Sequence, residues 1–178
     1  IQQAVESNGV SGLLPVRKDY VTNYYFPYSA GKDSLVYLKT SYRHRPAFFL
    51  RDAAGEKRIR TRDISFDEQF SYRNGKIVYA AYETHPRWGW QDYSVIKILD
   101  IHTGRKQKLT SKSKYFTPDI SADGSRVAAV QVNTDGKSEL HVLDASSGEV
   151  LQRIHSTEIS LFTDPKFMDA QTLITAVR

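Results

Sequence analysis

The feature that most constrains the fold of this chain is an internal repeat. In each copy a polar turn leads into a short apolar strand, and an aspartate then precedes a second polar turn. The aspartates of the second turn are Asp52, Asp100 and Asp144, at intervals of 48 and 44 residues. A fourth copy begins near Asp164 and reaches Val177. Four short strands in a repeat of this length are typical of β-propeller blades, whereas helical repeats would need a 3.6-residue hydrophobic period.

Each copy is expected to form one four-stranded antiparallel sheet that starts with an inner strand. We place the inner strands at residues 24–28, 66–72, 115–120 and 159–163. The third copy shows the pattern best, because residues 119–130 join an Asp-Gly turn to a run of small and branched apolar residues, as in a hairpin that enters a buried strand. The sequence therefore predicts an all-β chain, a β-propeller fragment of about three and a half four-stranded antiparallel blades.

The repeat also suggests how the chain is divided. Residues 1–22 do not fit it and are interpreted as an N-terminal extension, while residues 23–178 form the partial propeller. The approximate limits of the copies are residues 23–63, 64–112, 113–156 and 157–178. A blade buries both of its faces only between two neighbours, so we expect the blades that complete the ring to belong to the same polypeptide.

The third copy carries the motif by which the chain resembles a known family. Residues 118–124 read Pro-Asp-Ile-Ser-Ala-Asp-Gly, which is similar to the Pro-x-x-Ser-x-Asp-Gly motif of TolB-like (WD-like) propeller repeats. The first and fourth copies keep Pro27 and Pro165, and the second copy has lost both the proline and the aspartate. The resemblance spans residues 23–178 and implies a propeller fold. It also implies a periplasmic or secreted envelope protein, and it gives little information about function.

The sequence holds no complete catalytic motif. It has no cysteine, no His-Glu-x-x-His, no Gly-x-Ser-x-Gly and no phosphate-binding loop, and its five histidines are scattered. Asp119, Ser121 and Asp123 resemble the start of a calcium loop, but Val130 occupies the position of that loop's final glutamate. We interpret these residues as a turn. We expect no catalytic residue, no metal site and no cofactor in this chain.

The formal net charge of +5 raises the question of nucleic-acid binding. Much of the excess lies in residues 57–62 and 105–114. In the first stretch Arg58, Arg60 and Arg62 alternate with Ile59 and Thr61, as on a strand with one solvated face, and the second stretch resembles a polar turn. Basic side chains also protect exposed sheet edges from pairing. We therefore expect no nucleic-acid partner, and no apolar run is long enough to predict a membrane span.

Two hairpins carry the candidate binding residues. The second copy has an insertion over residues 83–93 that combines aromatic and charged side chains, namely Arg87, Trp88, Trp90 and Tyr93. Tryptophan and arginine are enriched at the centres of binding interfaces. The alternative is that the insertion packs on its own blade or on a neighbour. The equivalent hairpin of the first copy holds Arg43 and His44, which could lie on the same face or form only a solvated basic turn.

These observations favour a non-catalytic module that binds a protein, a peptide or a small molecule, as part of a larger bacterial envelope protein. Its partner is expected to be either the rest of the same polypeptide or another protein. The alternative is an accessory propeller of a peptidase, because the resemblance extends to blades that accompany prolyl-oligopeptidase-like and zinc aminopeptidase-like domains. A catalytic motif elsewhere in the reading frame would favour that alternative.

Overall fold

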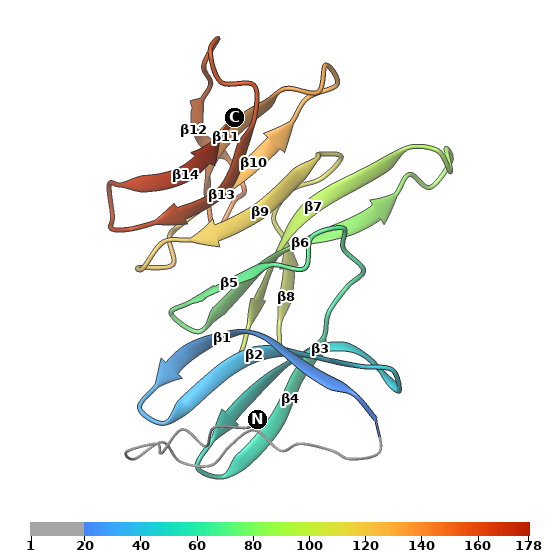
Figure 1. Ribbon diagram of the computed structural model, residues 1–178, viewed down its shortest axis with the longest axis vertical. Helices are drawn as coiled ribbons and strands as arrows, with labels where there is room; N and C mark the ends of the chain where they lie inside the picture. Colours follow the sequence, from blue (N-terminus) through green and yellow to red (C-terminus); the bar gives the residue numbers. More distant parts are fainter. Residues whose placement is uncertain (1–19) are drawn as a thin grey trace, which may run out of the picture.

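The computed structural model describes residues 20–178, which form fourteen β-strands and no helix. The predicted extension over residues 1–22 lies largely outside the described residues. Within residues 20–178 there is accordingly no helix that could cross a membrane. The strands form three four-stranded antiparallel sheets and one two-stranded sheet, stacked along the long axis of the molecule (Figure 1). The expected all-β fold of about three and a half blades is confirmed.

Each sheet follows the chain order from its inner to its outer strand, and we call the sheets blades 1 to 4. Blade 1 contains β1 (Thr22–Gly31), β2 (Ser34–Ser41), β3 (His44–Asp52) and β4 (Gly55–Thr61). Blade 2 contains β5 (Phe70–Arg73), β6 (Lys76–Thr84), β7 (Asp92–Asp100) and β8 (Lys106–Lys108). Blade 3 contains β9 (Tyr115–Ile120), β10 (Arg126–Val132), β11 (Ser138–Asp144) and β12 (Val150–Ile154). The two strands of blade 4 are β13 (Phe162–Phe167) and β14 (Leu173–Val177).

The core is divided among the junctions between successive blades. Phe48 of blade 1 and Tyr79 of blade 2 are fully buried at the first junction, in a cluster rich in aromatic rings. Smaller side chains of β6 and β10, among them Val78 and Ala129, fill the second junction. Phe162 anchors the third. The middle strands are buried on both faces because neighbouring blades cover them, which explains their nearly continuous apolar runs.

The inner strand of the third copy spans residues 115–120 as expected, whereas those of the other three copies have other bounds. The first, third and fourth copies have a residue with positive φ and a shift of register directly before the motif proline, at Phe26, Thr117 and Asp164. Proline has no N–H for the strand ladder, and a β-bulge accommodates it. The second copy lacks the proline, and β5 pairs with β6 without a shift. The inner strands therefore extend past the proline in blade 4, and β5 begins at Phe70 instead of Phe66.

The aspartates that defined the repeat close the turns between the third and fourth strands, as predicted. The Asp100 carboxylate accepts hydrogen bonds from the amides of His102 and Thr103, at 3.0 and 2.7 Å. The Asp144 carboxylate accepts from the amides of Ser146 and Ser147, at 2.9 and 2.8 Å. These bonds replace ladder hydrogen bonds at the point where the strand ends, so the aspartate fixes the turn.

We expect these turns to make the fold sensitive to acid. Hydrogen bonds from Thr103 lower the pKa of Asp100, and hydrogen bonds from Ser146 and Ser147 lower the pKa of Asp144. A carboxyl group whose pKa is lower in the folded state stabilises the fold above its unfolded pKa of about 4, and this contribution is lost as the pH falls. The double variant Asp100→Asn/Asp144→Asn should therefore melt at a lower temperature at pH 7 and show a weaker dependence of its Tm on pH.

The control for this experiment is Asp52→Asn, because the Asp52 carboxylate shows one hydrogen bond, from the Ala54 amide at 2.9 Å. Thermal melts followed by circular dichroism between pH 7 and pH 3 measure the effect. The control should keep the pH dependence of the original protein. An unchanged pH dependence in the double variant would contradict this role of the two turns.

Candidate binding face

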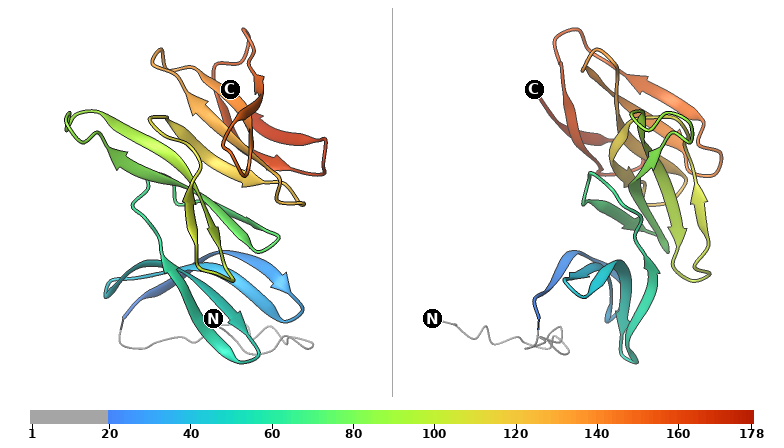
Figure 2. Two further views of the ribbon diagram at one scale, coloured as in Figure 1. Left: turned by 180° about the vertical axis from the view of Figure 1, so that it is seen from behind. Right: turned by 90° about the vertical axis from the view of Figure 1, so that its right-hand side faces the viewer.

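The topology sends one set of loops to a single face of the molecule. In every complete blade the hairpin between the second and third strands and the connection to the next blade lie at the same ends of the strands. We call this the connection face. The ends of the β2–β3 and β6–β7 hairpins both project to the right in Figure 1, and both project to the left when the molecule is seen from behind in Figure 2. The predicted binding residues are therefore on one face.

The insertion of the second copy is a lengthened β6–β7 hairpin with an ordered tip over residues 85–91. The His85 amide donates to the Gln91 carbonyl at 2.9 Å, and the Gln91 amide donates to the Trp88 carbonyl at 3.0 Å. The His85 ring nitrogen Nδ1 accepts from the amides of Arg87 and Trp88, both at 3.1 Å. His85 thus shapes the tip, a role that sequence reasoning did not assign to it.

The two tryptophans of this tip face solvent. Trp90 is fully exposed, and Trp88 is 58% exposed with the Arg87 guanidinium 5.4 Å from its ring centre. Neither packs into a blade junction, contrary to the alternative in which the insertion covers its own blade. Tyr93 differs, because it is partly buried against the core between blades 1 and 2 and its ring lies 6.1 Å from that of His85. Tyr93 therefore packs at the base of the hairpin and stabilises it.

Arg43 and His44 occupy the tight β2–β3 turn of blade 1. The His44 amide donates to the Ser41 hydroxyl at 3.2 Å. The Arg43 guanidinium lies 5.1 Å from the centre of the Tyr20 ring, and the His44 ring lies 6.3 Å from the same ring. The structure thus brings Arg43 and His44 together around Tyr20, on the same face as the tryptophans but on a separate hairpin.

The connection between blades 1 and 2 contributes apolar side chains that sequence reasoning missed. Ile64 is 79% exposed and Phe66 is 68% exposed. The Phe66 ring meets the Tyr82 ring edge-on at 4.8 Å, and the Tyr82 hydroxyl bonds to Asp92 at the base of the tryptophan hairpin. The sequence predicts Phe66 on an inner strand, where its side chain would be buried, and so it gives no sign that Phe66 is exposed.

A cleft of about 900 Å³ opens beside this connection, between blades 1 and 2. Blade 1 supplies Tyr25, Leu38, Arg45 and Pro46, and blade 2 supplies Tyr82 and Lys106. The strand β4 adds Arg60 and Thr61, and the connection adds residues 62–65, 67 and 68. The cleft combines apolar walls with several charged groups, which is the usual composition of a binding site.

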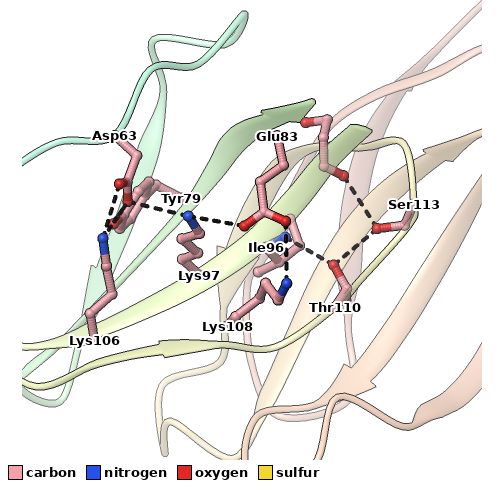
Figure 3. Close-up of polar contacts among 10 residues, drawn as sticks. Asp63, Tyr79, Glu83, Ile96, Lys97, Lys106, Lys108, Thr110 and Ser113 are labelled. Carbon is pink, nitrogen blue, oxygen red and sulfur yellow. Dashed lines mark hydrogen bonds and ion pairs between the residues drawn. The ribbon is translucent and has the colours of Figure 1, made fainter. Parts of the chain in front are cut away.

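One charged cluster of the cleft is internally neutralised. Asp63 accepts from Lys106 at 2.9 Å and from the Tyr79 hydroxyl at 2.7 Å, and Lys97 lies 3.6 Å away (Figure 3). Lys97 also lies 3.3 Å from Glu83 (Figure 3). Partial burial alone would raise the pKa of Asp63, but the bonds from Lys106 and Tyr79 lower it on balance. Asp63 therefore stays ionised, and the cluster ties blade 1 to blade 2.

Arg62 corrects the expectation of a solvated basic edge. Its side chain is buried, and its guanidinium donates to the backbone carbonyls of Asp67, Glu68 and Gln69. Arg58 and Arg60 are exposed, as predicted. The strand pattern does place alternate side chains on opposite faces, but the connection folds back over the end of β4 and covers Arg62.

The described residues gather no metal-binding group. No cluster of three or more histidine, aspartate or glutamate side chains forms within residues 20–178. The resemblance to a calcium loop has a structural explanation: Asp123 accepts from Ser121 and Ser125 within its turn, whereas buried Asp119 accepts from the Phe167 amide of blade 4 at 2.8 Å. The two carboxylates therefore serve different contacts.

Comparison with known proteins gives information about the fold. No protein-family model matches the sequence, and no curated protein matches it either. Among solved structures, a TolB-type protein of Agrobacterium tumefaciens matches with a TM-score of 0.58 at 13% identity, over 82% of this chain and 50% of that one. TolB of Acinetobacter baumannii matches with a TM-score of 0.54 at 14% identity, over 82% and 38% of the two chains.

Propellers of proteolytic enzymes are also similar. The β-propeller domain of the Trilobed protease of Pyrococcus furiosus matches with a TM-score of 0.53 at 16% identity, over 76% of this chain and 43% of that one. This chain thus spans half or less of the length of each of these solved structures. Identities this low establish the fold alone. Together with the stacked four-stranded sheets, they show that this chain has the fold of a TolB-like β-propeller, of which it forms a part.

Proposed function

We propose that this chain is a non-catalytic binding module that engages a protein or peptide through its connection face. The observation that carries the proposal is the exposure of Trp88 and Trp90 on an ordered hairpin tip. Apolar side chains that gather on an exposed surface mark interaction sites, and tryptophan and arginine are enriched at interface hot spots.

The surrounding residues have complementary parts in this proposal. Trp88 and Trp90 are the apolar anchors, and Arg87 supplies a charge next to Trp88. Arg43 and His44 form a second, basic contact on the β2–β3 hairpin. Tyr93 acts through the hairpin that it supports. The order of the tip lowers the entropy lost on binding, because the loop is already shaped before a partner arrives.

Replacing both tryptophans by alanine should remove binding while leaving the fold intact. Because Trp90 is fully exposed and Trp88 is largely exposed, their loss should shift the Tm by only a few degrees. Partner recovery should be measured by photo-cross-linking from position 91, where Gln91 is exposed next to Trp90, in the producing cells and by pull-down with the purified protein. Arg73→Ala is the control, because Arg73 is exposed on the β5–β6 turn at the opposite ends of the strands.

A discrete cross-linked product from position 91, absent from position 73 and lost from pull-downs by the double variant, is the expected result. A large fall in Tm on replacing the tryptophans would assign them to packing instead. Unchanged partner recovery by a stable double variant would remove the basis of the proposal.

A second candidate function is that of an accessory propeller of a peptidase. It is favoured by the similarity to the Pyrococcus furiosus protease propeller and to a puromycin-hydrolysing peptidase of Mycobacterium tuberculosis. The latter matches with a TM-score of 0.52 at 12% identity, over 72% of this chain and 20% of that one. The complete reading frame decides between the candidates: His-Glu-x-x-His or Gly-x-Ser-x-Gly beside the propeller would support the peptidase.

The same comparisons support a proposal about location and partner. We propose a periplasmic or secreted site of action, which the similarity to two TolB-type proteins favours. The partner is then either another part of the same polypeptide or a second protein of that compartment. Cell fractionation with an antibody against the propeller tests the location, and recovery in the cytosolic fraction alone would contradict it.

A further inference from the structure

The connection between blades 1 and 2 is held rigidly from beneath. The Arg62 side chain is 8% exposed, and its guanidinium donates to the carbonyls of Asp67, Glu68 and Gln69, the last at 3.0 Å. A planar guanidinium can satisfy several acceptors at once, which the single ammonium of lysine cannot do in the same geometry. Arg62 therefore fixes the path of the chain just after Phe66.

Two further contacts fix the same segment. The Tyr82 amide of β6 donates to the Ile64 carbonyl at 2.7 Å. The Asp67 carboxylate accepts from the amides of Gln69 and Thr117, both at 2.7 Å. The segment is thus tied to blades 2 and 3 on both sides of Phe66. Nevertheless Ile64 and Phe66 are largely exposed, and Ile64 lines the cleft.

The charge that remains available in the cleft is mainly positive. Asp63 is neutralised by Lys106 and Lys97, and the Asp67 carboxylate is occupied by backbone amides. Among residues 20–178, no carboxylate lies within ion-pair distance of Arg45 or Arg60. Glu68 is the exposed acidic side chain of the lining. The Arg60 guanidinium already donates to the Gly104 carbonyl at 2.7 Å, so Arg45 is the arginine that offers the cleft an uncompensated charge.

We propose that this cleft binds an extended peptide segment of a partner in which a carboxylate neighbours an apolar side chain. The carboxylate meets Arg45, and the apolar side chain packs on Ile64 and Pro46, all of which line the cleft. The proposal rests on the proposed binding function and deepens it, because the Tyr82–Asp92 bond makes the cleft continuous with the base of the tryptophan hairpin. In this arrangement Arg62 is a positioning residue: it holds the connection and does not touch the ligand.

The charge and the shape of the cleft both favour a peptide. Guanidinium groups bind carboxylates through charge-assisted hydrogen bonds, and these gain strength beside apolar walls that exclude water. Ile64 and Pro46 offer branched and ring aliphatic surface on which an apolar side chain can pack. A preformed wall also reduces the ordering cost of binding an extended segment.

The test uses a short fluorescein-labelled peptide in which glutamate alternates with leucine and phenylalanine, with anisotropy as the readout. The same peptide with glutamine in place of glutamate, a lysine version and a single-stranded oligothymidylate serve as comparison probes. We expect the glutamate peptide to bind at least about tenfold more tightly than the glutamine peptide, since one charge-assisted hydrogen bond accounts for a factor of this size. The chain has two tryptophans, both on the adjacent hairpin, so their emission gives a second readout.

Three variants show which side chains bind the peptide. Arg45→Glu should lower the affinity for the glutamate peptide at least about tenfold and raise the affinity for the lysine peptide. Ile64→Ser should lower the affinity for both the glutamate peptide and the glutamine peptide. Arg73→Glu, the same charge change on the opposite ends of the strands, should leave all affinities unchanged. Arg45, Ile64 and Arg73 are exposed, so these variants are expected to keep the fold, as a thermal melt checks.

Three results would overturn the inference: equal affinity for the glutamate and glutamine peptides, equal weakening by Arg45→Glu and Arg73→Glu, or tighter binding of the oligothymidylate than of the glutamate peptide. Failure here is distinguishable from failure of the proposed function. If the double tryptophan variant loses its partner while Arg45→Glu keeps it, the proposed binding function is supported and the proposed peptide cleft is contradicted. If Arg45→Glu lowers the affinity for the peptide while the tryptophan variant still recovers the partner, the cleft is a binding site and the tryptophan hairpin is not.

Discussion

Replacing Gly148 by alanine is expected to destabilise the fold by about 2 to 5 kcal/mol, which combines a left-handed backbone cost of about 1–2 kcal/mol with an overpacking cost of about 1–3 kcal/mol. Gly148 lies in the β11–β12 turn with φ of +78°. A Cβ at this position would lie 2.0 Å from the Leu109 carbonyl oxygen, which belongs to the segment after β8 of blade 2. The backbone of one blade would have to move away from the other.

Gly104 provides a matched control for this experiment. It occupies the same place in the β7–β8 turn, with φ of +68°, and a Cβ there would meet no atom within 4 Å. Gly104→Ala should therefore show only the backbone cost of about 1–2 kcal/mol. Chemical denaturation of both variants measures the difference. Equal losses would show that the blades separate easily at this contact.

Replacing Phe48 by alanine is expected to cost about 3–5 kcal/mol of the free energy of unfolding. Phe48 has no exposed surface, and its ring lies 5.1 Å from the ring of Phe70 and 5.2 Å from that of Tyr79. It thus joins a strand of blade 1 to two strands of blade 2. The cavity left by alanine would open at the junction, where neither blade can collapse without losing its own sheet geometry.

Phe66→Ala is the control for Phe48, since Phe66 is largely exposed on the connection face. Its loss should cost less than about 1 kcal/mol of stability, as is usual for exposed positions. Urea denaturation followed by circular dichroism compares the two variants. A small loss for Phe48→Ala would mean that the blades fold without support from their junction, contrary to the packing described above.

The sequence was most informative where a residue acts through its own segment. The spacing of Asp52, Asp100 and Asp144 predicted the turns after β3, β7 and β11, because an aspartate that accepts bonds from the next residues acts locally. The prediction of the inner strands was less accurate. The strand over residues 115–120 was expected and holds Pro118, but the strand expected at residues 159–163 is β13 (Phe162–Phe167), which runs past Pro165 because a bulge accommodates the ring.

The candidate site could be predicted only in part. The hairpin with Trp88 and Trp90 stands out in the sequence, since two tryptophans in a long insertion are unusual, and the equivalence of the hairpins placed Arg43 on the same face. The exposure of the tryptophans could not be predicted, because the sequence allowed packing against a neighbour equally well. Ile64 and Phe66 were missed because apolar residues near a strand are normally taken as buried.

What the sequence alone determined is the repeated blade: strand alternation, turn aspartates and a period of 48 and 44 residues are short-range properties of the chain. What only the tertiary structure decided is the environment at the junctions. Arg62 is buried and Arg60 exposed although both follow the same alternation, and Gly148 meets Leu109 whereas Gly104 meets nothing. These differences arise because a side chain at a blade edge is covered or exposed by the neighbouring blade, which is distant in sequence and has no local signal.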